Sequence, residues 1–156
     1  MTVELLWPMG LTLLLAIGAL SDIKDRRLPN WLSLLLLLYG LGHGFYLASW
    51  SGMGWHALHF AVALVVGMPL FAMKWFGGGD VKFYAGAATY FAVQDGVQAL
   101  LWVSLLGVVL MLSWIVVRRV VLKGKAAVTG NHALFPYGVA IMAGMTALAW
   151  AQSPVF

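Results

Sequence analysis

Six long apolar segments dominate the sequence and leave room for one class of fold. They cover residues 3–20, 31–49, 57–76, 79–95, 97–117 and 134–151. Most of them approach the ~20 residues that a helix needs to cross the hydrocarbon core of a bilayer. Only 9% of the residues are charged, against about 25% in soluble domains. The sequence therefore predicts an all-α, polytopic membrane helix bundle with about six transmembrane helices, forming one domain over residues 1–156.

The basic residues predict how this bundle is oriented. If the chain alternates sides, the loops around 21–30, 74–82 and 118–133 share one face of the membrane. That face carries all nine basic residues: Lys24, Arg26, Arg27, Lys74, Lys82, Arg118, Arg119, Lys123 and Lys125. Since basic loops stay in the cytoplasm, we expect a cytoplasmic basic face and both termini outside. The net charge of +4 then indicates orientation and contact with membrane lipids, and no nucleic-acid partner.

Two of the five acidic residues, Asp22 and Asp80, fall at the same depth on this basic face. Asp22 follows the first apolar segment, and Asp80 begins the fourth one, 58 positions later. An ionisable residue at the edge of a span is costly and is a candidate for function. The simpler interpretation is interfacial anchoring, in which each acid pairs with the lysine two positions later, Lys24 or Lys82. Two acids at matched depth favour a functional site.

Three glycines, Gly77, Gly78 and Gly79, come directly before Asp80. Glycine admits positive φ and close backbone approach, so we expect the chain to turn or unwind here. Such backbone is tolerated at membrane depth where it is buried in protein or lines a wet cavity. A flexible loop between helices is the alternative. Two carboxylates that face each other share a proton and can activate water for attack on an amide carbonyl.

The two acidic segments carry a resemblance to a known family. The segment GGGDVK, residues 77–82, resembles the G-x-G-D-x-K signature of the type IV prepilin peptidases. The segment DIKDRRLPN, which begins at Asp22, is similar to the first aspartate motif of that family. The late segment FPYGVAI resembles the stretch that opens the family's last helix. Because G-x-G-D also occurs in presenilin-like proteases, the resemblance depends on both motifs together, and it extends over nearly the whole chain.

The resemblance implies an aspartic endopeptidase with Asp22 and Asp80 as its catalytic pair. Its substrates would be prepilins or pseudopilins with an N-terminal leader and a hydrophobic segment, cut at the cytoplasmic face after a leader that ends in glycine. The residues expected to shape the site or to bind substrate are Lys24, Arg27, Pro29, Asn30, Gly77, Gly78, Gly79, Lys82 and Pro136.

The resemblance also implies a particular subtype. Larger bacterial members carry a cytoplasmic methyltransferase insertion, often with paired CxxC motifs. This chain has no cysteine, and only the ten residues 21–30 separate its first two apolar segments. It is therefore similar to the short, peptidase-only type of tight-adherence (Flp) pili, a multi-pass protein of the bacterial inner membrane.

No cofactor and no metal are expected. Asp22 and Asp25 form a D-x-x-D pair that could hold a divalent cation together with Asp80. Hard cations need more oxygen ligands than this face clearly offers. Pairing of Asp25 with Arg26 or Arg27, or solvation in this charged loop, is the simpler interpretation.

The histidines give no comparable signal. His43, His56 and His59 fall at or near the outer ends of the second and third apolar segments, on the side opposite the aspartates. We expect them at the membrane interface, near Trp50 and Trp55.

A second function class stays open at this point. The protein could be a non-catalytic small membrane carrier or a pilus-assembly subunit, in which the two aspartates relay protons or bind an ion. Acids in transport paths also lie at broken helices. No acid or paired polar cluster marks the midplane or the outer half of the predicted bundle, however, and this favours the peptidase.

Overall fold

The structure is a computed structural model that describes residues 3–120 and 136–153. These residues form helices joined by short connections. In chain order they are α1 (Val3–Asp25), α2 (Asn30–Ala72), α3 (Gly78–Ala88), the 3-10 turn η1 (Val93–Asp95), α4 (Gly96–Val120) and α5 (Tyr137–Ala151). No strand occurs in the two described ranges. The predicted all-α helix bundle is confirmed.

The predicted count of about six spans is not confirmed. In the part of the chain that the structure describes, three helices are long and apolar enough to cross a membrane: Glu4–Asp25, Asn30–Ala72 and Val93–Val117. The fourth predicted segment, 79–95, contains the 11-residue α3 and the η1 turn, and 11 residues fall short of the ~20 that a bilayer needs. Helix α5 is apolar but has only 15 residues. The short α3 has a charged residue, Asp80, in its first turn, and its second half is buried inside the bundle.

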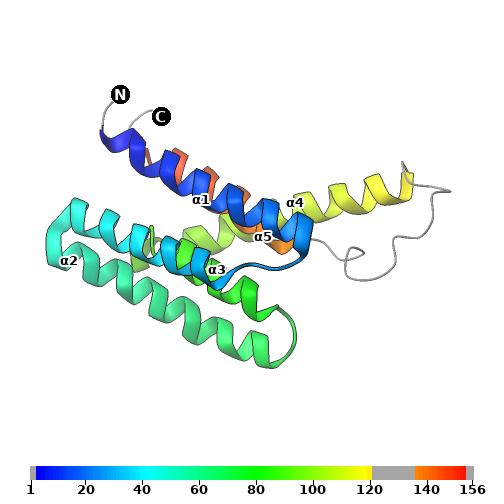
Figure 1. Cartoon of the computed structure of the whole chain (residues 1–156), viewed down its shortest axis with the longest axis horizontal. Helices are drawn as coiled ribbons and strands as arrows, with labels where there is room; N and C mark the ends of the chain where they lie inside the picture. The colour runs from blue at the N-terminus through cyan, green and yellow to red at the C-terminus, as the bar shows by residue number, and fades with distance from the viewer. Residues whose placement is uncertain (1–2, 121–135, 154–156) are drawn as a thin grey trace.

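Helix α2 contains the second and third predicted segments as two arms. Ala48 (φ −147°, ψ 33°) and Ser49 (φ 53°, ψ −139°) leave the helical conformation, and the two arms run side by side in opposite directions (Figure 1). The arms approach closely at Gly44, where a Cβ atom would lie 2.6 Å from the His56 ring. The break coincides with the predicted end of the second segment at residue 49. Helix α2 is therefore a helical hairpin.

Two groups of helices make up the bundle. Helix α5 packs against both α1 and α4, while α3 packs against both arms of the α2 hairpin. Small residues allow the closest contacts: a Cβ atom at Gly86 of α3 would lie 2.6 Å from the Ser33 carbonyl oxygen of α2. Large apolar side chains remain exposed on the outside, such as Leu13 (65%), Val65 (68%) and Leu105 (63%). An apolar exterior of this extent indicates contact with lipid.

Three histidines of α2 contact the residues that follow α3. The sequence predicted that these histidines lie at the membrane interface. The Nδ1 atoms of His43, His56 and His59 lie 3.1, 2.8 and 3.0 Å from the carbonyl oxygens of residues 90, 89 and 91, respectively. A carbonyl oxygen only accepts hydrogen bonds, so each Nδ1 carries the proton and donates it. His56 and His59 are 4% and 3% exposed. The interfacial prediction is therefore wrong for these two, which are buried and bind carbonyl groups of the residues that follow α3.

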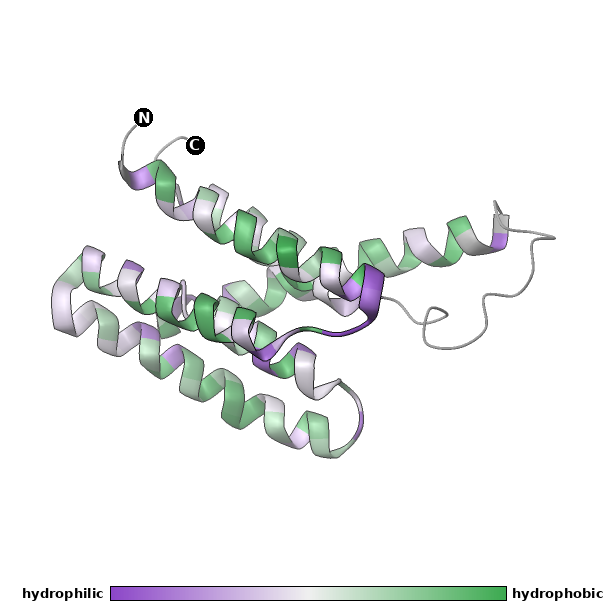
Figure 2. Ribbon diagram, in the orientation of Figure 1, coloured by the Kyte–Doolittle hydropathy of each residue, from purple (hydrophilic) through white to green (hydrophobic). Residues whose placement is uncertain are grey.

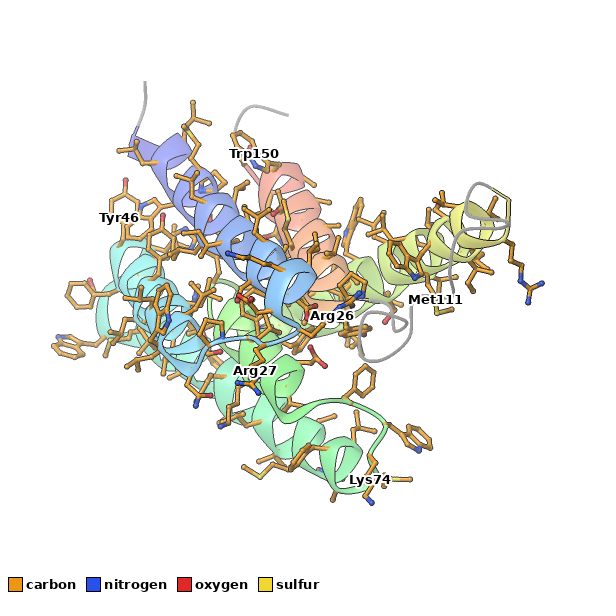
Figure 3. All side chains as sticks on the ribbon, turned by 45° about the vertical axis from the view of Figure 1, so that its right-hand side comes forward. Arg26, Arg27, Tyr46, Lys74, Met111 and Trp150 are labelled. Atoms are coloured by element: carbon orange, nitrogen blue, oxygen red, sulfur yellow. The ribbon has the colours of Figure 1, made fainter. Side chains whose placement is uncertain are left out.

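Charged residues gather at one end of the bundle. Hydrophilic residues lie at the α1–α2 connection and near the start of α3 (Figure 2). Figure 3 shows Arg26, Arg27 and Lys74 well away from Tyr46 and Trp150. The start of α1 and the end of α5 lie together at the end of the molecule opposite the α1–α2 connection (Figure 1). The predicted basic residues Lys123 and Lys125 lie outside the described residues.

Candidate active site

Asp22 lies in the last turn of α1 and is only 7% exposed. Its carboxylate reaches the other end of the chain: Oδ2 accepts a hydrogen bond of 2.7 Å from the backbone N–H of Gly138, in the first turn of α5. Helix α1 ends three residues later, because Arg26 takes a positive φ of 54°. The side chain of Asp22 therefore joins the end of α1 to the start of α5.

Asp80 lies in the first turn of α3 and is half-buried. Its Oδ2 accepts a hydrogen bond of 3.2 Å from the N–H of Gly77, the residue that caps the helix. A Cβ atom at Gly77 would lie 2.8 Å from this oxygen, so any side chain at position 77 would displace the Asp80 carboxylate. The turn itself occurs earlier than the sequence predicted: Lys74 has a φ of 59°, whereas Gly77 has a φ of −70° and Gly78 and Gly79 already belong to the helix.

The two carboxylates interact electrostatically. The pKa of Asp80 is raised from 3.8 to about 6: burial contributes most and the negative charge of Asp22 acts in the same direction, while the Gly77 N–H bond opposes the shift. Asp80 lies outside the three helices that are long enough to span a membrane. A charge raises the pKa of a neighbouring acid only when it is close. The fold has therefore brought together two acids that are 58 positions apart in the sequence.

The segments that carry the two acids also contact each other. Lys82 donates a hydrogen bond of 3.3 Å from Nζ to Oδ1 of Asn30, the first residue of α2. A Cβ atom at Gly79 would lie 3.5 Å from the Cβ of Leu28. The alternative interpretation paired Lys82 with Asp80, whereas the hydrogen bond of this lysine in the structure goes to Asn30. The two aspartate motifs are thus in direct contact.

The remaining predicted site residues lie around this contact. Pro29 caps the start of α2, and Pro136 caps the start of α5, two residues before Gly138. The side chains of Lys24, Asp25 and Arg27 are exposed. Asp25 and Arg27 line one shallow depression at the α1–α2 connection, whose edge is fixed by a 2.8 Å bond from the Ser21 hydroxyl to the Arg27 carbonyl oxygen.

A cavity of about 360 Å³ opens beside Asp80. Most of its lining is apolar and comes from the second arm of α2, from α3 and from α4, for example Val66, Val81 and Leu100. Asp80 and Tyr137 contribute polar groups to the wall, and Tyr137 packs against Phe76 with ring centroids 4.9 Å apart. Such a cavity can hold an apolar segment with one peptide bond near a carboxylate.

Two residues of this site were not predicted from the sequence. Tyr137 and Gly138 belong to the FPYGVAI segment, of which only Pro136 was predicted to contribute. The position of the segment directly before an apolar stretch was the available signal. That signal gives the start of a helix, but it cannot show that this start meets Asp22, which is 116 positions away.

Comparison with known proteins identifies the family of the chain. The sequence model of the type IV leader peptidase family matches residues 9–112, which include both aspartates and end before α5. A prepilin peptidase of Methanococcus maripaludis, EppA, is 27% identical over 82 residues, which amount to 53% of this chain and 22% of that relative. No solved structure matches the chain. Since the family match covers 104 of the 156 residues, the chain belongs to the type IV leader peptidase family.

Proposed function

We propose that the protein is a membrane-embedded aspartic endopeptidase that removes the leader peptide of type IV prepilins or pseudopilins. The observation that carries this proposal is the convergence of Asp22 and Asp80 in a family of leader peptidases. Asp22 comes from α1 and Asp80 from α3, and each carboxylate is held by a backbone N–H. Pairs of carboxylates with separated proton affinities are the catalytic groups of aspartic proteases.

In the proposed reaction the two aspartates share one proton. The ionised carboxylate takes a proton from a water molecule, and the water oxygen attacks the carbonyl carbon of the scissile peptide. The protonated carboxyl group donates its proton to the carbonyl oxygen, which gives a tetrahedral intermediate. Collapse of the intermediate breaks the C–N bond, and the leaving amine receives a proton from the pair. No cofactor takes part in these steps.

The surroundings of the pair support a substrate with an apolar segment. The cavity beside Asp80 is mainly apolar, and the outside of the bundle is apolar too. A prepilin could therefore dock from the membrane with its hydrophobic segment among the helices. Its extended leader junction would pass Gly77, where the absence of a side chain keeps the backbone close to Asp80. Exposed Lys24 and Arg27 lie at the same end and would contact the leader.

We place the active site on the cytoplasmic side of the bacterial inner membrane, with both termini outside. The charged residues at the Asp22 end of the bundle support this orientation, because basic segments remain cytoplasmic. The Flp-type prepilins are the proposed substrates because α1 and α2 are separated only by residues 26–29. A connection of this length holds no methyltransferase domain, and N-methylation is therefore no part of the proposal.

Co-expression with a Flp-type prepilin tests the function. We expect the prepilin to change to a faster-migrating form, whose new N-terminus follows the leader glycine. The control is the same prepilin without this protein, and a second control is a prepilin in which that glycine is replaced. A prepilin that keeps its leader in the presence of membrane-inserted protein would contradict the peptidase assignment.

The pH dependence of cleavage is expected to report the proton on Asp80. Its pKa is raised to about 6, first by burial and then by Asp22, so this carboxyl group loses its proton as the pH rises through 6. We expect kcat/KM of the purified enzyme to fall on this alkaline side, because the free enzyme then lacks its acid. The apparent value belongs to the coupled pair. A kcat/KM that stays constant from pH 5 to pH 8 would contradict this role.

A further inference from the structure

We infer that Gly138 is a positioning residue for the proposed reaction: its N–H holds the Asp22 carboxylate, and its missing side chain leaves the space that this carboxylate occupies. The inference rests on the proposed function, in which Asp22 is one of the two catalytic acids. It adds a third helix, α5, to a site whose two acids come from α1 and α3. Gly138 lies beyond residues 9–112, to which the family match is confined.

The hydrogen bond is the first observation that supports this role. The distance from the Gly138 nitrogen to Asp22 Oδ2 is 2.7 Å, and the contact is buried. This length is at the short end for an N–H bond to oxygen and is typical of a charged acceptor. Helix α5 has 15 residues, and the N–H groups of its first turn have no partner inside the helix. Asp22 supplies that partner, so the helix and the carboxylate fix each other.

The space around Gly138 is the second observation. A Cβ atom at this position would lie 2.9 Å from Oδ2, 3.1 Å from Cβ and 3.3 Å from Cγ of Asp22. Rotation of the Asp22 side chain about its Cα–Cβ bond would relieve only the contacts with Oδ2 and Cγ. The contact with the Asp22 Cβ remains, because this atom is fixed to the backbone of α1. Any side chain at position 138 must therefore move the carboxylate or separate α5 from α1.

The bond also distinguishes the two acids. An N–H can only donate, so Asp22 Oδ2 is held as an acceptor and Oδ1 is the oxygen that receives the proton of the water. Asp80 has the weaker bond, 3.2 Å to Gly77. Burial and the Asp22 charge both raise the pKa of Asp80, so the shared proton resides there. Gly138 thus makes Asp22 the base and Asp80 the acid of the pair.

The test compares Gly138→Ala with Gly144→Ala in the full-length enzyme, using a purified prepilin. Gly144 lies on the same helix, and a Cβ atom there would be 2.6 Å from the Val103 backbone nitrogen of α4. Gly144→Ala therefore disturbs the packing of α5 without contact to Asp22. We expect Gly138→Ala to lower kcat by about 10²-fold, the cost of a misplaced catalytic group, with KM within about twofold of wild type. Gly144→Ala should lower the melting temperature, with kcat per folded molecule near wild type.

Two kinetic results would overturn the inference. One is a wild-type kcat for Gly138→Ala, and the other is a fall in kcat that only follows the folded fraction, as in Gly144→Ala. A second measurement, of stability in a double-mutant cycle, does not depend on activity. Gly138→Ala should cost less stability in an Asp22→Ala background than in wild type, because Oδ2 and Cγ are then absent; equal costs would also overturn the inference. If Asp22→Asn cleaves normally, the proposed function fails instead.

Discussion

Replacement of Asp22 or Asp80 by asparagine is expected to abolish prepilin processing. Each variant keeps the shape of the side chain and an oxygen that can accept the N–H of Gly138 or Gly77, so the helices should remain in place. What is lost is the proton transfer, which contributes about 10²–10⁴-fold to catalysis. The measurement is the fraction of co-expressed Flp-type prepilin that loses its leader, determined by gel mobility and by mass spectrometry of the product.

Asp25→Asn is the matched control for this experiment. Asp25 is three positions from Asp22 on the same helix, but its side chain is exposed and lies at the depression of the α1–α2 connection. We expect full processing by this variant. All three proteins must be inserted in the membrane at equal amounts. Normal processing by both dyad variants would refute the aspartic mechanism and favour the alternative in which the acids relay protons or bind an ion.

Gly40→Ala is expected to have a large destabilising effect, because Gly40 lies at the contact between α2 and the end of α3. A Cβ atom at Gly40 would lie 2.5 Å from the Thr89 carbonyl oxygen and 2.6 Å from the Tyr90 nitrogen. Both are backbone atoms at the end of α3, so they cannot rotate away. The first arm of α2 must then separate from α3, which costs about 1–3 kcal/mol. It would also strain the bond from His43, one turn later, to the Tyr90 carbonyl oxygen. Thermal unfolding in detergent measures this loss.

Gly42→Ala serves as the control for Gly40→Ala. It makes the same chemical change in the same arm of α2, but a Cβ atom at Gly42 would meet only Trp7, at 3.8 Å, an ordinary contact distance. We expect a melting temperature equal to that of wild type or slightly higher, since alanine favours helix over glycine by about 1 kcal/mol. Equal destabilisation by the two substitutions would contradict the close approach of α2 and α3.

The sequence was sufficient for the fold class, the family and the proposed pair of acids. Charge placement put Asp22 and Asp80 at one depth, and the structure places the two acids within electrostatic reach. The two acids could be singled out from the sequence because an ionisable residue at the edge of an apolar segment is costly and therefore rare. The catalytic role of the pair, and the roles of Lys24 and Arg27, remain predictions.

The helix count and the histidines could not be obtained in the same way. The segment 79–95 is apolar enough to suggest a span, but α3 ends at Ala88, and the carbonyl groups of the next three residues are bound by His43, His56 and His59 from α2. The acceptors are backbone atoms more than 30 positions away, and a carbonyl group has no signature in the sequence. Gly138 could not be predicted for the same reason, because it contacts Asp22 through a backbone N–H, which every residue except proline has.

The contact between Asp22 and Gly138 has a consequence for the timing of biosynthesis. Asp22 enters the membrane with the first helix, and the N–H that holds it is synthesised 116 residues later. At about 5–20 residues per second, this delay lasts roughly 6 to 23 seconds. During the first half of that interval the chain also lacks Asp80, which is made 58 positions after Asp22, and during the second half it has both acids without Gly138. Under the proposed function we therefore expect that a nascent chain cuts no precursor before residue 138 has been synthesised, because the carboxylate of Asp22 is not yet held.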